Sequence, residues 1–212
     1  MSPFRMGATP VTWGVWKEYR RSVGVPGTEI KLPDDPGWGY PDDHPVINVW
    51  WEDIMYPGGF CEWASGVAGF KLTLPTDAQW EYAARGGQDG LEYPWGNDFD
   101  RTKLWSSSEE YDWPDKTASV YRTDRIYRNG YGLTDMVGNV NEWCADYYNR
   151  DYRPAGKDPV DTQESEYRCV RGHSWNYFGS PDDFRCARRL RDDPDFWCGD
   201  SDLGFRLSAG PR

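Results

Sequence analysis

The chain has 212 residues and a mass of 24.5 kDa, a size that favours a single domain over residues 1–212. Its 24 Lys and Arg residues against 35 Asp and Glu residues give a formal net charge of −11, which would repel phosphate backbones, so we expect no nucleic-acid partner. The sequence contains no run of about 18 apolar residues and no apolar core of a secretory signal at its start. We therefore expect neither membrane insertion nor an export signal, and the sequence names no compartment.

Aromatic residues dominate the apolar content. Hydrophobic residues make up only 38% of the chain, but 13 Trp, 14 Tyr and 8 Phe offer a large buried area per residue. The 23 Gly and 16 Pro interrupt the chain too often for long helices or a regular barrel. These features predict an irregular α+β fold with little regular secondary structure and a core built on aromatic side chains.

The first predicted helix covers residues 12–22. Thr12 is a suitable N-cap, and Val15, Trp16 and Tyr19 recur at the spacing of one helical face. The proline-rich segment 25–45 follows and predicts an extended surface loop.

Two further helical signals come next. A helix is predicted over 51–64, interrupted or shifted by the Pro-Gly-Gly sequence at 57–59. Thr76 can cap another helix, and Gln79, three residues later, can reach back to the Thr76 amide as in a capping box. The two glycines at 86–87 should end this helix.

A turn-rich region over 88–117 separates the helices from the predicted strands. Short strands are expected at 118–122, 167–171 and 204–208, where β-forming residues alternate with polar ones. The sequence shows no internal repeat.

The five cysteines form no CxxC pair, and only His44 and His173 could complete a zinc set, so we expect no structural zinc. Free thiols in a reducing compartment and one or two disulfides both remain open. The cysteines are Cys61, Cys144, Cys169, Cys186 and Cys198.

Five segments, in this order, resemble the formylglycine-generating, sulfatase-modifying enzyme superfamily. The resemblance spans most of the chain and implies a C-type-lectin-like fold. The segments are LPTDAQWEYAARGG at 74–87, PWGN at 94–97, NGYGLTDMVGNVNEW at 129–143, RGHSW at 171–175 and GFRL at 204–207.

Members of this superfamily that are enzymes are copper-dependent oxidases with two cysteines shortly after the RGGS-type turn. At the matching positions this chain has Tyr177 and Asp182. A phenol and a carboxylate cannot replace two thiolates that hold Cu(I), because Cu(I) selects soft sulfur ligands. Neither Cys186 nor Cys198 restores the spacing, so the sequence predicts that the oxidase chemistry is absent.

A second branch of the superfamily comprises the variable proteins of diversity-generating retroelements, whose hypervariable region ends in a GFRL-like sequence. Copying errors at template adenines there exclude Lys, Glu, Gln and Met, and in the simplest form Trp. Residues 1–175 contain 24 Lys, Glu, Gln and Met residues, whereas 176–202 contain none. Trp197 breaks the simplest rule, although an adenine-containing arginine codon could also yield Trp. We therefore interpret 176–202 as a candidate variable region.

This candidate region predicts a binding surface for an unknown protein or glycan ligand. Aromatic side chains would give rigid contact area and Asp and Ser adaptable hydrogen bonds, while Phe184, Cys186 and Ala187 would point inward. The alternative is an ordinary acidic loop. The predicted ligand-binding residues are Tyr177, Phe178, Asp182, Asp183, Leu190, Arg191, Asp192, Asp195, Phe196, Trp197, Asp200 and Ser201.

The resemblance also implies a Ca²⁺ site in NGYGLTDMVGNVNEW. Asp135 and Glu142 would supply side-chain oxygens, and Gly138 and Val140 backbone carbonyls, a hard oxygen set that suits Ca²⁺. In the alternative, Asp135 caps its turn and Glu142 pairs with an arginine. The family usually has Trp where this chain has Asn141, which could open room for a ligand.

Three functions therefore compete. The preferred one is a ligand-binding protein without oxidase activity. The second is a metal-dependent oxidoreductase of the same superfamily, using relocated cysteines or an iron held by His44, His173 and a carboxylate. The third is a structural accessory domain with no ligand, for which residues 176–202 would be the same in every copy of the gene.

Overall fold

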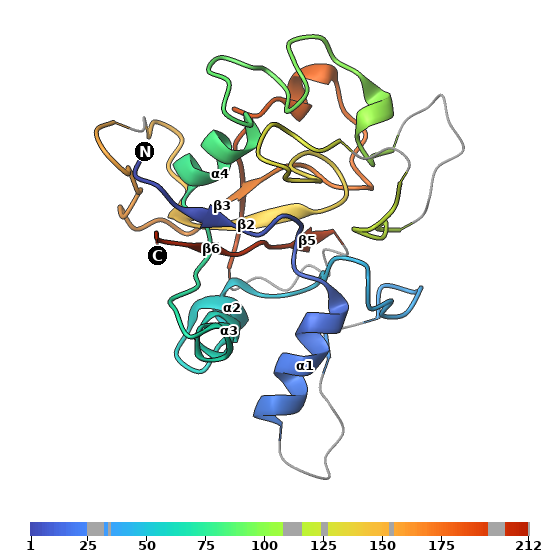
Figure 1. Ribbon diagram of the computed structural model, residues 1–212, viewed down its shortest axis with the longest axis vertical. Coiled ribbons are helices and arrows are strands. Elements are labelled where there is room, and N and C mark those ends of the chain that lie inside the picture. Colours follow the sequence, from blue (N-terminus) through green and yellow to red (C-terminus); the bar gives the residue numbers. More distant parts are fainter. Residues whose placement is uncertain are drawn as a thin grey trace.

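The computed structural model describes residues 1–24, 32–33, 35–107, 116–123, 127–152, 155–194 and 202–211. Short helices and strands alternate with long connecting segments, which confirms the predicted α+β class (Figure 1). Within these ranges no helix is long and apolar enough to cross a membrane. The helices are α1 (Trp13–Val23), α2 (Trp51–Met55), α3 (Phe60–Ala68), α4 (Asp77–Ala84) and the 3-10 helices η1 (Arg101–Lys103) and η2 (Pro181–Phe184).

A four-stranded sheet with the order β4-β3-β2-β5 lies at the centre. β3 is antiparallel to β2 and β4, whereas β5 runs parallel to β2. A separate pair joins β1 to β6, so both chain termini lie on the same side of the molecule (Figure 1). The strands are β1 (Arg5–Met6), β2 (Asn141–Tyr147), β3 (Arg168–Arg171), β4 (Leu190–Asp192), β5 (Leu203–Gly204) and β6 (Ser208–Ala209).

The two faces of the central sheet carry different hydrophobic clusters. Trp143 and Val170 belong to the large cluster with α1, α2 and α3, whereas Cys144 and Cys169 pack with Trp80 of α4. Successive side chains of a strand point to opposite faces, which explains this division. Figure 1 shows α4 on one side of the sheet and α1, α2 and α3 on the other.

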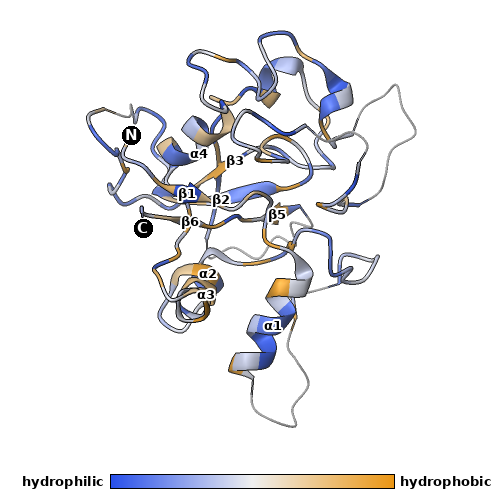
Figure 2. Ribbon diagram, in the orientation of Figure 1, coloured by the Kyte–Doolittle hydropathy of each residue, from blue (hydrophilic) through white to orange (hydrophobic). Residues whose placement is uncertain are grey.

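Aromatic rings form the centre of the large cluster, as the composition predicted. Trp16 stacks on Phe60 with ring centroids 5.4 Å apart, and Phe60 meets Phe205 edge-on at 5.1 Å. All three side chains are fully buried or nearly so. Figure 2 shows hydrophobic residues along α2 and α3 and a mixture of hydrophilic and hydrophobic residues along α1.

Helix α1 follows the predicted span, but its buried face and its cap differ from the prediction. Val15 is 44% exposed, and Trp13 takes its place beside Trp16 and Tyr19. The Thr12 side chain makes no capping hydrogen bond. Thr12 instead bridges to the chain near Pro45, and the first helical amide, that of Trp13, donates to the His44 carbonyl at 2.9 Å.

The other helical predictions are confirmed. The Pro-Gly-Gly sequence at 57–59 separates α2 from α3, and a Cβ on Gly59 would lie 2.8 Å from the Tyr56 carbonyl oxygen. At α4 the capping box is complete: the Gln79 amide donates to Thr76 Oγ1 at 3.1 Å, and the Thr76 amide donates to Gln79 Oε1 at 3.0 Å. Residues close in the sequence therefore set both the break between α2 and α3 and the start of α4.

The strand predictions are only partly correct. The strand predicted at 167–171 is β3, but the segment 204–208 is divided between the end of β5 and the start of β6, and 118–122 contains no strand. In the latter segment the Ala118 amide and carbonyl are bonded by the Asn139 side chain at 2.8 and 3.1 Å. A side-chain amide therefore takes the backbone groups that a strand ladder would use.

Candidate functional site

Asp135, one of the predicted calcium ligands, is buried and paired with an arginine. Its Oδ1 accepts from Arg122 Nη2 at 2.6 Å, and its Oδ2 accepts from Arg122 Nη1 and Asn139 Nδ2, each at 3.0 Å. The backbone of Asp135 has φ of +53°, a conformation that Asp tolerates better than most residues. Both carboxylate oxygens are thus already bonded within the protein.

Glu142, the second predicted calcium ligand, forms a fully buried pair with Arg206. Arg206 Nε donates to Oε2 and Nη2 donates to Oε1, both at 2.7 Å, and Trp80 Nε1 donates to Oε2 at 2.7 Å. The same guanidinium also donates to the carbonyls of Gly7, Thr134 and Asp135. Bidentate pairing of this kind compensates both charges in a fully buried site.

This arrangement does not fit a Ca²⁺ ion, because the carboxylate oxygens that would bind it already accept from guanidinium groups. The carbonyl of Gly138 likewise accepts from the Val140 amide at 3.0 Å. Glu142 therefore follows the alternative in which it pairs with an arginine. The structure does not test calcium binding itself, and the arginine pairing predicts that removal of calcium leaves the stability of the protein unchanged.

A tight turn directly after β3 leads into the candidate variable region, which begins at residue 176. Gly172 has φ of +97°, and a Cβ there would lie 3.3 Å from the Trp80 ring. His173, also left-handed with φ of +58°, is buried, and its ring stacks on Tyr177 at 4.1 Å. Burial lowers the pKa of His173 to about 4, so this side chain is neutral at pH 7.

The helix η2 anchors the middle of the region. Asp183 Oδ2 accepts from the Ser180 amide at 3.0 Å and from its hydroxyl at 2.9 Å, which holds the first turn. The Phe184 ring is fully buried among Tyr93, Leu104 and Val137. Packing and hydrogen bonds therefore hold this described part of the region to the rest of the fold.

The predicted binding residues divide into exposed and supported side chains. Phe178 is 57% exposed, and Asp182 and Arg191 are also exposed, whereas Tyr177 is half-buried between the His173 and Phe184 rings. The partly exposed residues are Asp183, Leu190 and Asp192, and those outside the described residues are Asp195, Phe196, Trp197, Asp200 and Ser201.

The expected inward-pointing residues are confirmed for two of three. Phe184 and Cys186 are fully buried, but Ala187 is exposed. Farther along, residues 190–192 form the edge strand β4 and pair with β3. The edge of the central sheet therefore lies inside the candidate variable region, which sequence periodicity did not reveal because the strand has only three residues.

A cluster of polar side chains that the sequence did not predict joins the two ends of the candidate variable region. Ser174 Oγ donates to Asp202 Oδ2 at 2.5 Å, and Asn141 Nδ2 donates to the same oxygen at 3.1 Å. Beside it, the Trp175 and Trp38 rings meet edge-on at 5.4 Å. The departure from Trp at position 141 was the available signal, because the Asn141 side-chain amide can donate to the Asp202 carboxylate.

The two positions that carry cysteines in the enzymes hold groups with other functions here. Tyr177 packs on His173, and Asp182 forms an ion pair with Arg185 at 2.8 Å. Across the described ranges, no group of three or more His, Cys, Asp or Glu side chains is placed to hold a metal. His44, offered for an iron site, has its Nδ1 3.0 Å from Thr117 Oγ1.

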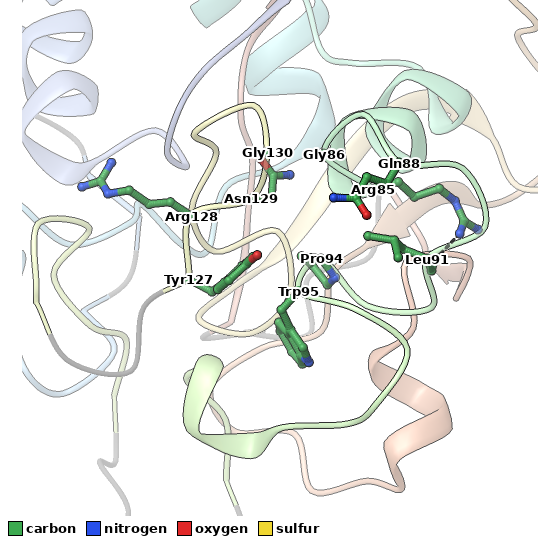
Figure 3. Close-up of a pocket in the computed structure, with 10 residues that line it drawn as sticks. All are labelled: Arg85, Gly86, Gln88, Leu91, Pro94, Trp95, Tyr127, Arg128, Asn129 and Gly130. Atoms are coloured by element: carbon green, nitrogen blue, oxygen red, sulfur yellow. Dashed lines mark hydrogen bonds between the residues drawn. The ribbon is translucent and has the colours of Figure 1, made fainter.

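A small cavity lies apart from the predicted residues, between the end of α4 and the segment 127–130 (Figure 3). Its volume is about 160 Å³, below the roughly 300–1,000 Å³ of typical ligand pockets. Arg85 in its wall is engaged by Glu81 and by the Leu91 carbonyl. The cavity is lined by Arg85, Gly86, Gln88, Leu91, Pro94, Trp95, Tyr127, Arg128, Asn129 and Gly130.

Comparison with known proteins assigns the chain to a family. Residues 1–209 match the family model described as sulfatase-modifying factor enzyme 1-like domain. The chain is 34% identical to a formylglycine-generating enzyme of Thermomonospora curvata, covering 96% of this chain and 68% of that protein. It is also 34% identical to the inactive C-alpha-formylglycine-generating enzyme 2 of Mus musculus, covering 87% of this chain and 56% of that protein.

Among solved structures, Treponema denticola variable protein 1 superposes with a TM-score of 0.72 and 26% identity, covering 98% of this chain and 84% of that one. This structural match confirms the predicted C-type-lectin-like fold of the formylglycine-generating type. The matched protein itself belongs to the variable branch of the superfamily. The family match over residues 1–209 spans all five of the motifs. The chain therefore belongs to the sulfatase-modifying factor enzyme 1-like family.

Proposed function

We propose that this chain is a ligand-binding member of its family, which displays the surface of residues 176–202 to a protein or glycan and has no oxidase activity. One observation carries the proposal. Within the described part of this segment, buried anchors such as Phe184 and Cys186 alternate with exposed side chains such as Phe178, Asp182 and Arg191. The exposed residues can change without removing the contacts that hold the segment, which is what a diversified surface requires.

The chemistry of the exposed side chains suits recognition of another macromolecule. Phe178 offers a rigid apolar surface, and charges of both signs lie near it in the chain at Asp182, Arg185 and Arg191. Aromatic and arginine side chains contribute most to protein interfaces, and aromatic rings also stack on sugars.

The alternative function, that of an oxidoreductase, is supported by sequence identity to known enzymes and opposed by the residues at two positions. The chain is equally identical, at 34%, to a relative named as an active enzyme and to one named as inactive, so overall identity does not decide. The decision falls on positions 177 and 182, where Tyr and Asp stand in place of the paired thiols. Without those thiols the chain lacks the soft sulfur ligands that would hold Cu(I).

The gene provides the most direct test of the variable-region proposal. We expect a near-copy of the DNA encoding 176–202 beside a reverse transcriptase gene, differing from it at adenines. We also expect natural copies of the gene to differ at Phe178, Asp182 and Arg191 and to keep Phe184 and Cys186. A segment that is the same in every copy, with no such template, would favour the structural accessory domain.

A further inference from the structure

Cys144 of β2 and Cys169 of β3 lie on neighbouring central strands, beside the paired residues Trp143 and Val170. The register of the two strands shifts between Trp143 and Tyr147, so Cys144 lies at the start of an irregular stretch of the ladder. Both cysteines pack in the same cluster on the α4 face, and their thiols are hydrogen-bond partners. Because a disulfide needs Cβ atoms about 3.5–4.5 Å apart, a local adjustment of this irregular stretch would bring the two sulfurs within bonding distance.

The two thiols share one buried environment. Both are fully buried in the cluster on the α4 face of the sheet, and the Cys144 thiol has the Cys169 thiol as a hydrogen-bond partner. The Cys144 carbonyl accepts from Trp51 Nε1 at 2.9 Å, which holds this strand position from the other side of the sheet. Both cysteines are free thiols in the structure.

Charged groups lie beside Cys169. Cys169 Sγ donates to Asp77 Oδ1 at 3.2 Å, and Asp77 is paired with Arg171 and, at 2.8 Å, with Arg189. Burial, together with the neighbouring thiol, raises the pKa of Cys144 well above its usual range. The closed core therefore disfavours the Cys144 thiolate that disulfide formation needs.

We propose that Cys144 and Cys169 form a cross-strand disulfide when the chain folds in the presence of a small-molecule disulfide. The thiolate of one of the two cysteines attacks one sulfur of oxidised glutathione and releases one glutathione thiolate. The thiolate of the other cysteine then attacks the protein sulfur of this mixed disulfide and releases the second. The two thiol protons pass to the released glutathione, so one glutathione disulfide yields one protein disulfide and two glutathione thiols.

Burial explains when this reaction occurs. In the folded protein neither sulfur is exposed, so a reagent reaches them only before the sheet closes or after local opening. Cys186 lies in the same cluster but follows η2, and its amide is bonded to the Glu92 carbonyl at 2.7 Å, so no strand register places it opposite either cysteine. The disulfide would join the two central strands of the sheet, independently of the proposed ligand-binding function.

The test refolds the full chain from denaturant in a mixture of reduced and oxidised glutathione and maps disulfides by non-reducing peptide mass analysis. We expect a linked pair of peptides containing Cys144 and Cys169, and a Tm about 5 °C or more above that of the reduced protein. The matched control Cys186→Ala keeps this linkage, whereas Cys169→Ala loses it.

The mapping of the unaltered chain decides the matter even if a variant fails to fold. Free thiols at both positions in folded, oxidised protein would overturn the proposal. Linkage of Cys169 to Cys186 or Cys198 in place of Cys144 would overturn it too.

Discussion

Replacement of Glu142 by Gln should destabilise the fold severely, whether or not calcium is present. The change keeps the shape of the side chain but leaves the buried Arg206 guanidinium without a counter-charge and turns an amide N–H towards it. Both side chains of the pair are 0% exposed, so water cannot compensate. Removal of one partner of a buried ion pair costs about 3–5 kcal/mol. For a chain of this length that corresponds to a fall in Tm of about 6–20 °C.

The assay is urea and thermal denaturation, followed by circular dichroism, with and without EDTA. The matched control is Glu18→Gln, which makes the same chemical change in the exposed pair of Glu18 with Arg21 and should cost about 0–1 kcal/mol. Because Arg206 and Arg122 already engage the two carboxylates, EDTA should leave the Tm of the unaltered protein unchanged.

Two results would contradict this reasoning. A cost below about 1 kcal/mol for Glu142→Gln would mean that the pair is not desolvated as the structure shows. If EDTA lowers the Tm of the unaltered protein but not that of Glu142→Gln, calcium is the partner of Glu142. A ligand that binds only the folded state adds about 2.7 kcal/mol at a hundredfold excess over Kd, so such a fall is measurable.

Phe178→Ala should leave the Tm nearly unchanged, whereas Phe184→Ala should lower the free energy of unfolding by about 3–5 kcal/mol because it leaves a cavity at a buried site. Equal losses of stability for the two variants in thermal denaturation would contradict the surface proposal. Tyr177→Ala should fall between them, since its ring packs on His173. The pKa of His173 is lower in the folded protein than in the unfolded chain, so the unfolded chain binds more protons as pH falls from about 6.5 to about 4, and the free energy of unfolding decreases over that range. Because Asn also tolerates the left-handed backbone of this position, His173→Asn should fold and should make the urea midpoint less dependent on pH in that window. An unchanged pH dependence in this variant would show that His173 is not the group involved. Copper-loaded protein should leave the mass of a cysteine-containing sulfatase peptide unchanged, and conversion to formylglycine at enzyme-like rates would refute the proposed loss of oxidase activity.

Local chemistry made several features predictable from the sequence. Two helix boundaries depend only on residues within one or two turns, so the local sequence suffices to predict them. They are the capping box of Thr76 and Gln79 and the break at 57–59. The aromatic core followed from composition, and the family followed from five motifs in a fixed order. Burial of Phe184 and Cys186 was also expected, although periodicity within that segment is weak.

The partners of buried charges were decided only by the tertiary structure. The sequence placed Asp135 and Glu142 in one motif and could not choose between calcium and an arginine, because the chosen arginine of Glu142, Arg206, lies 64 residues away. The orientation of α1 likewise depended on a bridge between Thr12 and Pro45. Sequence patterns report short-range geometry, whereas ion pairing and strand register depend on contacts that close long loops. For that reason the motif identified the family, but only the folded chain showed guanidinium groups at the predicted metal ligands.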